Sequence, residues 1–350
     1  MARILMKGNE AIGEAAIIAG CRHYFGYPIT PQNEIPAYMS LRLPKVGGTF
    51  LQAESEVAAI NMVFGAAAAG ARAMTSSSSP GISLKMEGIS YMAGAELPAV
   101  VVNMMRGGPG LGNIAGAQGD YFQAVKGGGH GDYRCIVLAP STVQELADLT
   151  VKAFDLADQY RMVVILLGDG FIGQMSEPIL LPQPSGRVFD KSAWALTGAK
   201  DRDTHLIASM RLSPDNALEK LNLRLQEKYA MVEKNDRLWE DSQSADAEYL
   251  LVAFGLSARI CRSAASALRK SGIKAGLFRP ITLWPFPTQE LAAAATGKKK
   301  VLVVEMNAGQ MVEDARLSIG SATAVDFYGT MGGSTPTVDA IVERITAYAR

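Results

Sequence analysis

One stretch decides how the fold of this chain is interpreted: Phe50-Leu51-Gln52-Ala53-Glu54-Ser55-Glu56-Val57-Ala58-Ala59-Ile60, in which an apolar strand runs into a helix of small residues. A glutamate at a helix N-terminus is stabilised by free N–H groups and by the helix dipole, which accounts structurally for at least one of the two carboxylates. The helix after Glu56 is so apolar that we expect this carboxylate to be partly buried. Burial suits a carboxyl group to proton transfer, so Glu56 is the candidate catalytic residue.

Composition limits the classes of protein to consider. The chain has 350 residues, 48% of them hydrophobic and 19% charged, enough for one large domain or two smaller ones. Its 34 basic and 34 acidic residues balance, which argues against a nucleic-acid-binding protein. The N-terminus lacks the apolar core of a signal peptide, and no apolar run approaches the length of a membrane helix. We therefore expect a cytoplasmic protein that binds neither nucleic acid nor membrane.

The cysteines give no sign of a metal site. Cys21, Cys135 and Cys261 lie far apart and form neither a CxxC pair nor a ligand cluster. Reduced thiols and no bound metal are the simplest interpretation. Any iron–sulfur cluster needed by the function would have to be carried by another chain.

Strand and helix patterns alternate along residues 1–178. Apolar and aromatic runs predict strands, the longest of them buried as in parallel sheets, at 23–27, 72–75, 98–104, 135–139 and 162–167. Helical spacing predicts helices at 9–19, 56–70 and 142–157. We also expect Thr30-Pro31 to start a helix, with Thr30 as its N-cap, and the turn 76–81 to lead into another. This alternation predicts a doubly wound α/β domain that ends near Pro178.

The composition changes over residues 179–247. Prolines come first and a charged stretch follows, but apolar spacing persists in a helix that Asp215 is expected to cap. We therefore predict an ordered connector. Strand and helix patterns resume over 248–350 and predict a second doubly wound α/β domain.

Two glycine motifs carry weaker signals. Gly110-Leu111-Gly112-Asn113-Ile114-Ala115 matches the dinucleotide-binding fingerprint, but no clear helix starts on it. Gly168-Asp169-Gly170 matches the start of the magnesium–diphosphate motif of thiamine enzymes, but the later Asn-Asn pair is missing. We expect Asp169 to be a turn residue at a strand end. If thiamine diphosphate is bound, its diphosphate belongs to a partner chain.

Two polar side chains follow strand ends, where parallel sheets bind their ligands. Arg106 comes just after the strand at 98–104, and its planar guanidinium suits a carboxylate. The alternative is an exposed arginine on a glycine loop. Thr30 and the helix N-terminus beside it could bind an anion, or Thr30 could be a plain N-cap.

A series of motifs, taken together, resembles the alpha subunit of 2-oxoacid:ferredoxin oxidoreductases. In order they are Tyr27-Pro28-Ile29-Thr30-Pro31, Glu54-Ser55-Glu56, the stretch 75–81, Arg106-Gly107-Gly108-Pro109, the stretch 279–287 and Glu305-Met306-Asn307. The resemblance covers nearly the whole chain. It implies a pyrimidine-type thiamine diphosphate domain at 1–178, the connector at 179–247 and a transketolase C-terminal-like domain at 248–350.

The resemblance also implies a reaction and roles for residues. The family cleaves a 2-oxoacid with thiamine diphosphate, passes electrons through iron–sulfur clusters to ferredoxin, and forms an acyl-CoA and carbon dioxide. Glu56 matches the glutamate that hydrogen-bonds the aminopyrimidine ring, although its register against Glu54 is open. Thr30 and Arg106 match the groups that bind the substrate carboxylate. The other cofactor-binding residues it implies are Pro28, Ile29 and Ser79.

Partners follow from the same resemblance. A beta subunit would carry the diphosphate site with Mg²⁺ and a [4Fe-4S] cluster. Gamma and ferredoxin-like delta subunits would complete the hetero-oligomer, with ferredoxin as electron acceptor and CoA as a substrate.

The substrate is the finest distinction that the resemblance offers. The apolar Leu111 and Ile114 resemble the branched-chain (3-methyl-2-oxobutanoate) group, whereas members acting on 2-oxoglutarate tend to have polar residues there. The alternatives are a 2-oxoglutarate enzyme, in which Lys85 or Lys126 would meet the second carboxylate, and a non-redox, transketolase-like thiamine enzyme.

Overall fold

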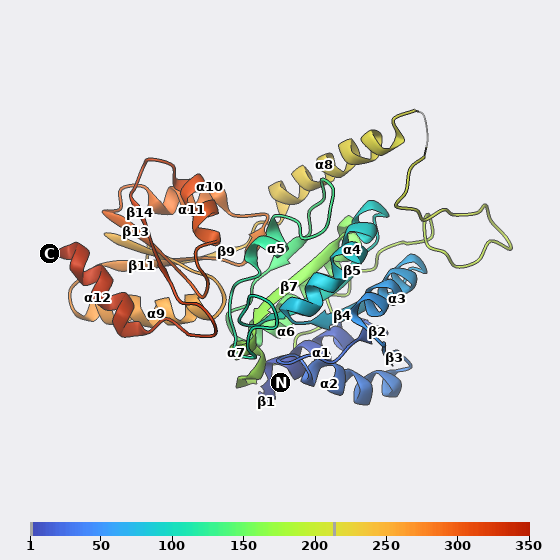
Figure 1. The fold of residues 1–350 in the computed structure, drawn as a ribbon, viewed down its shortest axis with the longest axis horizontal. Helices are drawn as coiled ribbons and strands as arrows, with labels where there is room; N and C mark the ends of the chain where they lie inside the picture. Colours follow the sequence, from blue (N-terminus) through green and yellow to red (C-terminus); the bar gives the residue numbers. More distant parts are fainter. Residues whose placement is uncertain (1–2, 213–214) are drawn as a thin grey trace.

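The computed structural model describes residues 3–212 and 215–350, and it contains two α/β units side by side (Figure 1). Each unit has a largely parallel sheet covered by helices on both faces. A long helix, α8 (Ala217–Asn235), and an irregular segment before it lie between the two units along the chain. This arrangement confirms the predicted fold class of two doubly wound α/β domains.

The first sheet has seven strands in the order β12-β6-β7-β5-β4-β2-β3. All neighbours pair in parallel except β12, which runs antiparallel to β6. The central strands are buried throughout, as their continuous apolar sequences require. The strands are β2 (His23–Gly26), β3 (Thr49–Gln52), β4 (Ala73–Ser77), β5 (Ala99–Met105), β6 (Ile136–Leu138), β7 (Val163–Asp169) and β12 (Thr282–Trp284).

The helices of the first unit form two layers. One face is covered by α1 (Gly8–Ile18), α2 (Glu34–Arg42) and α6 (Val143–Tyr160), and the other by α3 (Glu56–Ala68) and α4 (Ser79–Gly94). Helices α3 and α4 approach closely, because a Cβ at Gly88 would lie 2.6 Å from Ile60. The remaining short elements are β1 (Ile4–Lys7), the 3₁₀ helix η1 (Leu43–Val46), α5 (Tyr121–Val125), α7 (Gly170–Gln174) and β8 (Ser176–Ile179). Strands β1 and β8 pair with each other.

The second sheet has five strands in the order β14-β13-β10-β11-β9, with only β9 antiparallel. Helices α9 (Gly255–Lys270) and α12 (Val338–Ala349) cover one face, and α10 (Thr288–Ala295) and α11 (Met311–Ile319) cover the other (Figure 1). The strands are β9 (Trp239–Ser242), β10 (Tyr249–Val252), β11 (Ala275–Pro280), β13 (Lys300–Glu305) and β14 (Val325–Gly329).

The two sheets take strands from outside their own stretches of sequence. Strand β9 lies in the range 179–247, where the sequence predicts a connector, and it joins the second sheet. Strand β12 lies in the range 248–350, yet it forms the edge of the first sheet. The two units are therefore joined by sheet pairing as well as by the chain.

Buried polar side chains also join the units. The Arg279 guanidinium donates to Glu145 of α6 at 2.6 and 2.9 Å and to Glu240 of β9 at 2.9 Å. The buried Gln118 amide donates to the backbone carbonyl of Phe254 at 2.8 Å and accepts from the Ser257 hydroxyl at 2.9 Å.

Two local predictions in the first unit are wrong. Helix α2 begins at Glu34 rather than at Pro31, because the Pro31 carbonyl accepts from the Asn9 and Gln174 side chains and is not free to start a helix. Ser76 and Ser77 belong to β4 rather than to a turn, because they continue its pairing with β5.

The predicted cap of α8 is wrong by one residue. Asn216 takes the cap position and the helix starts at Ala217. Asn216 has a φ of 53°, a left-handed conformation that asparagine tolerates better than most residues, so it can end the turn from which the helix starts.

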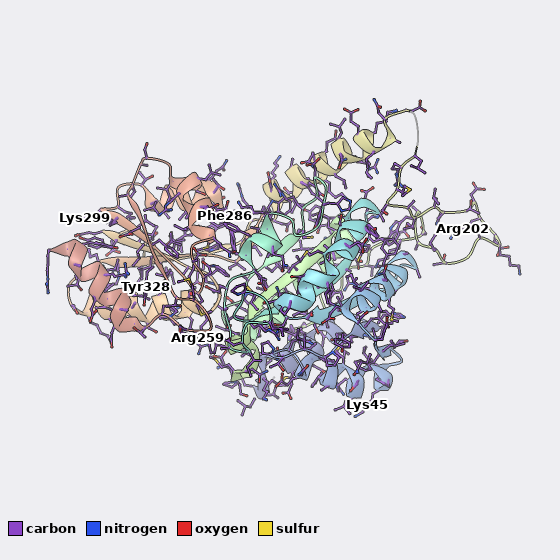
Figure 2. All side chains as sticks on the ribbon, in the orientation of Figure 1. Lys45, Arg202, Arg259, Phe286, Lys299 and Tyr328 are labelled. Atoms are coloured by element: carbon purple, nitrogen blue, oxygen red, sulfur yellow. The ribbon has the colours of Figure 1, made fainter. Side chains whose placement is uncertain are left out.

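Residues 180–212, here named the arm, contain no helix or strand. The arm crosses the C-terminal ends of α6 and α3 and extends beyond them, away from the second unit (Figures 1 and 2). Figure 2 labels Arg202 on its outer part.

Candidate active site

The predicted site residues all follow strands of the first sheet at its carboxyl edge. Thr30 follows β2, Glu56 follows β3, Ser79 follows β4 and Arg106 follows β5. Because parallel strands end at one edge, these four residues gather there, where α/β proteins bind their ligands.

Glu56 and Glu54 lie in different environments. Glu56 is the first residue of α3 and only 7% exposed, whereas Glu54 is exposed to solvent. The helix is capped by Ser55, whose hydroxyl accepts from the Ala58 N–H at 3.2 Å. Because Ser55 supplies the cap, the Glu56 carboxylate is left to other interactions.

The Glu56 carboxylate lies against the N-terminal turn of α4. A Cβ at Gly81 would sit 2.7 Å from Glu56 Oε1 and 2.1 Å from the Ser77 hydroxyl, so only glycine fits there. Gly81 thus allows the carboxylate, the end of β4 and the start of α4 to meet.

Buried polar atoms beside this contact lack partners. Within the described residues, no hydrogen bond reaches the hydroxyls of Thr75, Ser77 and Ser78 or the Nε of Arg106. Buried polar atoms without a partner are rare in proteins, and each indicates strain, a catalytic role or a missing ligand. The carboxylate and the hydroxyls together suit a nitrogen heterocycle such as an aminopyrimidine, which offers both donors and acceptors.

Arg106 and Thr30 are brought together as neighbours. The buried Arg106 guanidinium donates to the backbone carbonyls of Thr30 at 3.0 Å and Leu111 at 2.8 Å. In the described part of the chain it forms no ion pair, so its charge is available to an anion. Thr30 is exposed, and its hydroxyl accepts from the Asn33 amide at 3.3 Å.

A polar network fixes Ser79, and sequence reasoning missed two of its members. The Ser79 hydroxyl donates to Asp120 at 2.6 Å and accepts from the Arg106 N–H at 3.0 Å. The Asn103 amide donates to the same Asp120 oxygen at 2.9 Å. Burial raises the pKa of Asp120, and the bonds from Ser79 and Asn103 oppose that rise. An asparagine near the end of an apolar strand was the available signal for Asn103.

Lys85, considered from the sequence only as a possible partner of a second substrate carboxylate, is another residue of the site. It is fully buried on α4, and its ammonium donates to the Glu56 backbone carbonyl at 3.3 Å. Burial lowers the pKa of Lys85 to about 8, although the negative charge of Glu56 raises it. The other lysine considered, Lys126, pairs with Asp314.

The remaining predicted residues lie on the surface of this chain. Pro28 is exposed and Ile29 partly exposed in the turn before α2. Leu111 is 80% exposed and Ile114 65% exposed, so they line no closed pocket here. Their loop touches the second unit, because the Asn113 amide donates to the Gly332 carbonyl at 2.6 Å.

Asp169 is the strand-end turn residue that the sequence predicted. It caps α7 by accepting from the Phe171 and Ile172 N–H groups at 3.1 Å, and it accepts from Leu256 N–H at 3.2 Å. Burial raises its pKa to about 6 against these hydrogen bonds.

Neither a metal cluster nor a membrane span emerges from the residues that the structure describes. No three His, Cys, Asp or Glu side chains are grouped so that they could hold a metal ion. No helix among these residues has both the length and the apolar character needed to cross a membrane.

Two family models match the chain. Residues 14–235 match "Pyruvate flavodoxin/ferredoxin oxidoreductase, thiamine diP-bdg", and residues 247–341 match "Pyruvate:ferredoxin oxidoreductase core domain II". The chain is also 51% identical over 349 residues to "Ketoisovalerate oxidoreductase subunit VorB" of Methanothermobacter thermautotrophicus, covering 100% of this chain and 99% of that protein. The chain belongs to the 2-oxoacid:ferredoxin oxidoreductase family. The resemblance drawn from the sequence motifs is thereby confirmed.

Other members of the oxidoreductase family are less similar. "2-oxoglutarate synthase subunit KorA" of the same organism is 35% identical, with 97% of each chain covered. The solved "2-oxoglutarate:ferredoxin oxidoreductase from Magnetococcus marinus with 2-oxoglutarate, coenzyme A and succinyl-CoA bound" matches with a TM-score of 0.89 and 28% identity. This chain is fully covered and spans 66% of that one. These matches confirm a thiamine-diphosphate-binding domain followed by a transketolase-like domain, and the relatives are subunits of multi-subunit enzymes.

Proposed function

We propose that this chain is the pyrimidine-binding subunit of an enzyme that converts 3-methyl-2-oxobutanoate and CoA to the acyl-CoA, carbon dioxide and reduced ferredoxin. The observation that carries the proposal is the buried Glu56 carboxylate beside unpartnered hydroxyls at the carboxyl edge of the first sheet. The identity of 51% to a ketoisovalerate oxidoreductase subunit supports the choice of substrate class.

Glu56 is the proposed catalytic residue of this chain. When bound, thiamine diphosphate supplies a nucleophilic carbon and accepts the electron pair left by decarboxylation. The Glu56 carboxyl group would form a hydrogen bond with a ring nitrogen of the aminopyrimidine and keep a proton at that nitrogen. Burial of the site strengthens such a hydrogen bond. Further cofactor contacts are assigned to Pro28, Ile29 and Ser79.

Thr30 and Arg106 are the proposed carboxylate-binding residues. Arg106 is held at two backbone carbonyls, so its unpartnered Nε–H is fixed in direction before substrate arrives. Fixed donors that orient the carboxylate raise the reaction rate, because the bound substrate then loses less translational and rotational entropy when it reaches the transition state. The engagement of Lys85 with Glu56 and of Lys126 with Asp314 favours a substrate with one carboxylate over 2-oxoglutarate.

Partner chains are part of the proposal. A beta subunit would carry the diphosphate site, Mg²⁺ and a [4Fe-4S] cluster, with gamma and delta subunits completing a cytoplasmic complex that reduces ferredoxin. The use of Asp169 as the cap of α7 supports a diphosphate site outside this chain.

Substitution of the two glutamates tests the role of Glu56. In the complex purified with its native partners under anaerobic conditions, Glu56→Gln should lower kcat for CoA-dependent viologen reduction by about 100-fold or more. Glu54→Gln is the matched control, since Glu54 is exposed, and should change kcat by less than about threefold. Equal effects of the two substitutions would refute the assignment.

A substrate panel in the same complex tests the substrate class. We expect the highest kcat/KM for 3-methyl-2-oxobutanoate among that acid, 2-oxoglutarate, pyruvate and an aryl 2-oxoacid. A preference for 2-oxoglutarate would retain the family and overturn the substrate assignment. Pockets discriminate one methylene only modestly, so activity with other small 2-oxoacids is compatible with the proposal.

A further inference from the structure

The arm exposes four large apolar side chains for most of their surface. Val188 is 93% exposed, Leu206 87%, Met210 70% and Leu212 88%. Burying one such side chain stabilises a protein by about 1.5–3 kcal/mol. A single chain that exposes four of them therefore forgoes a large part of the free energy that burial would supply. Isolated exposed apolar residues are ordinary, but a group of them on one segment marks an interaction site.

The first part of the arm is fixed to the body of the first unit. Lys191 forms an ion pair with Asp158 of α6 at 2.6 Å, and the Arg161 guanidinium stacks over the Trp194 ring at 4.6 Å. The Leu196 N–H donates to the carbonyl of Ala68 at the end of α3 at 2.8 Å.

The outer part of the arm is held by its own polar contacts. The Ala195 carbonyl binds both the His205 ring at 2.9 Å and the Arg202 guanidinium at 3.0 Å. The apolar side chains are therefore presented from a folded segment with a defined path rather than from a polar linker.

Exposed apolar residues continue from the arm onto the helices that begin at the active site. Ser209 lies against the end of α4, where a Cβ at Gly94 would be 3.5 Å from it. Met210 and Tyr91 of α4 both line a cavity of about 670 Å³. Leu84 of α4 and Val57 of α3 are also exposed. Exposed apolar side chains thus occur along the two helices between the arm, at their C-terminal ends, and Glu56 and Ser79, their first residues.

We infer that the arm, together with the exposed faces of α3 and α4, clasps the non-identical subunit that covers Glu56 and completes the cofactor site. This inference rests on the proposed function. The covering chain must hold the diphosphate end of the cofactor, and in this chain Asp169 is occupied as a helix cap. A second copy of this chain would bring only another pyrimidine-binding half, so it does not complete the site.

The charged residues of the arm also limit which partner surface can match it. Arg187 and Arg202 are on the arm, and among the described residues their guanidinium groups bond to neutral groups, Gln159 Oε1 for Arg187 and backbone carbonyls for Arg202. The exposed Asp201 and Asp203 flank Arg202, so the matching surface is an apolar patch with a polar rim of both charges, a composition typical of protein interfaces.

The test is the affinity of the complex, measured by native mass spectrometry over a dilution series of the co-purified subunits. The double substitution Leu206→Ser/Leu212→Ser should weaken binding of the diphosphate-bearing subunit at least 30-fold. The control, Leu41→Ser/Leu317→Ser, removes two exposed leucines from other surfaces and should leave the affinity within about threefold. Unchanged affinity of the arm variant would overturn the inference.

A second measurement does not depend on how well the variant folds. With Leu206 replaced by the photocrosslinking residue p-benzoylphenylalanine in the intact complex, irradiation should link this chain to the diphosphate-bearing subunit. Links only between two copies of this chain, or only within one copy, would overturn the inference. Both readouts are independent of turnover, so loss of the arm contact and failure of the Glu56 assignment are distinguishable.

Discussion

Lys85 is a buried cation of the site, and its burial destabilises the fold. Its ammonium is fully buried, and its one hydrogen bond among the described residues goes to a backbone carbonyl rather than to a carboxylate. Burial lowers its pKa from 10.5 to about 8. The unfolded chain therefore binds more protons than the folded chain between pH 8 and 10.5, so stability rises with pH across that window.

Lys85→Met should stabilise the chain at neutral pH. Removing a buried charge of this kind should raise the free energy of unfolding by roughly 1–3 kcal/mol at pH 7, and the gain should shrink toward zero near pH 10. Urea unfolding of the purified chain at pH 7, 8.5 and 10 measures this. Lys126→Met, which removes an exposed lysine, is the control. A variant less stable than the wild type at pH 7 would contradict the argument.

The sequence predicted some of these residues because their environment is local. The apolar helix after Glu56 indicated burial, and the structure separates Glu56 from Glu54 as that pattern requires. The burial of Lys85 could not be predicted, because it depends on a tertiary contact, the close approach of α4 to α3 at Gly88. The exposure of Leu111 and Ile114 is likewise a tertiary property, which their apolar sequence does not specify.

Among the elements, the buried central strands were predicted well, whereas the short edge strands β9 and β12 were missed. Continuous apolar runs gave β5 and β7 nearly to the residue, because a strand buried on both faces leaves little choice of composition. The start of α2 was wrong because side chains of Asn9 and Gln174, remote in sequence, take the Pro31 carbonyl. Local sequence patterns also could not predict that β9 joins the second sheet and β12 joins the first, because the partner of a strand depends on the topology of the whole fold.

Helix α8 is tied to the first unit by Glu96, which precedes β5. Its carboxylate pairs with Lys228 at 2.8 Å and Arg224 at 2.7 Å, both on α8. Burial raises the pKa of Glu96, but the hydrogen bonds from Lys228 and Arg224 outweigh it and lower the pKa to about 2. Because the pKa of Glu96 is lower in the folded chain than in the unfolded chain, the Glu96 carboxylate stabilises the fold at pH values above about 4.5. This stabilisation is lost as the pH falls toward 2.

Glu96→Gln should therefore weaken the attachment of α8 to the first unit at neutral pH. It should lower the free energy of unfolding less in acid. We expect a loss of roughly 1–2 kcal/mol at pH 7, reduced for the partial exposure of the pair, and a smaller difference from wild type at pH 3.5. Urea midpoints at the two pH values measure it, with Glu87→Gln as an exposed control. A difference that grows in acid would be inconsistent with the ion pairs.

At the scale of the whole molecule, Arg279 joins the two units through one buried guanidinium. It bonds to Glu145 in the first unit and to Glu240 in the second sheet. Sequence motifs assigned this arginine to the second domain and gave no sign of its partners, because those partners lie on other elements.

Arg279→Met should destabilise the whole chain, because it leaves the partly buried Glu145 carboxylate without a cation and leaves Glu240 paired only with the exposed Arg262. The expected loss is roughly 2–4 kcal/mol. Arg262→Met removes an exposed arginine that also pairs with Glu240 and should cost less than about 1 kcal/mol. Thermal unfolding followed by circular dichroism compares the two. Equal shifts in Tm would mean that the buried pairings contribute no more than the exposed pairing of Arg262.

The strand order of the first sheet also governs how the nascent chain can fold. Strand β6 is synthesised long before β12, its neighbour at the sheet edge. At 5–20 residues per second, the ribosome needs roughly 7–30 s to make the residues between them. During that interval the edge of β6 is bare, and a bare strand edge can pair with other chains. Translation of the second unit therefore closes an edge at which the unfinished chain is open to aggregation.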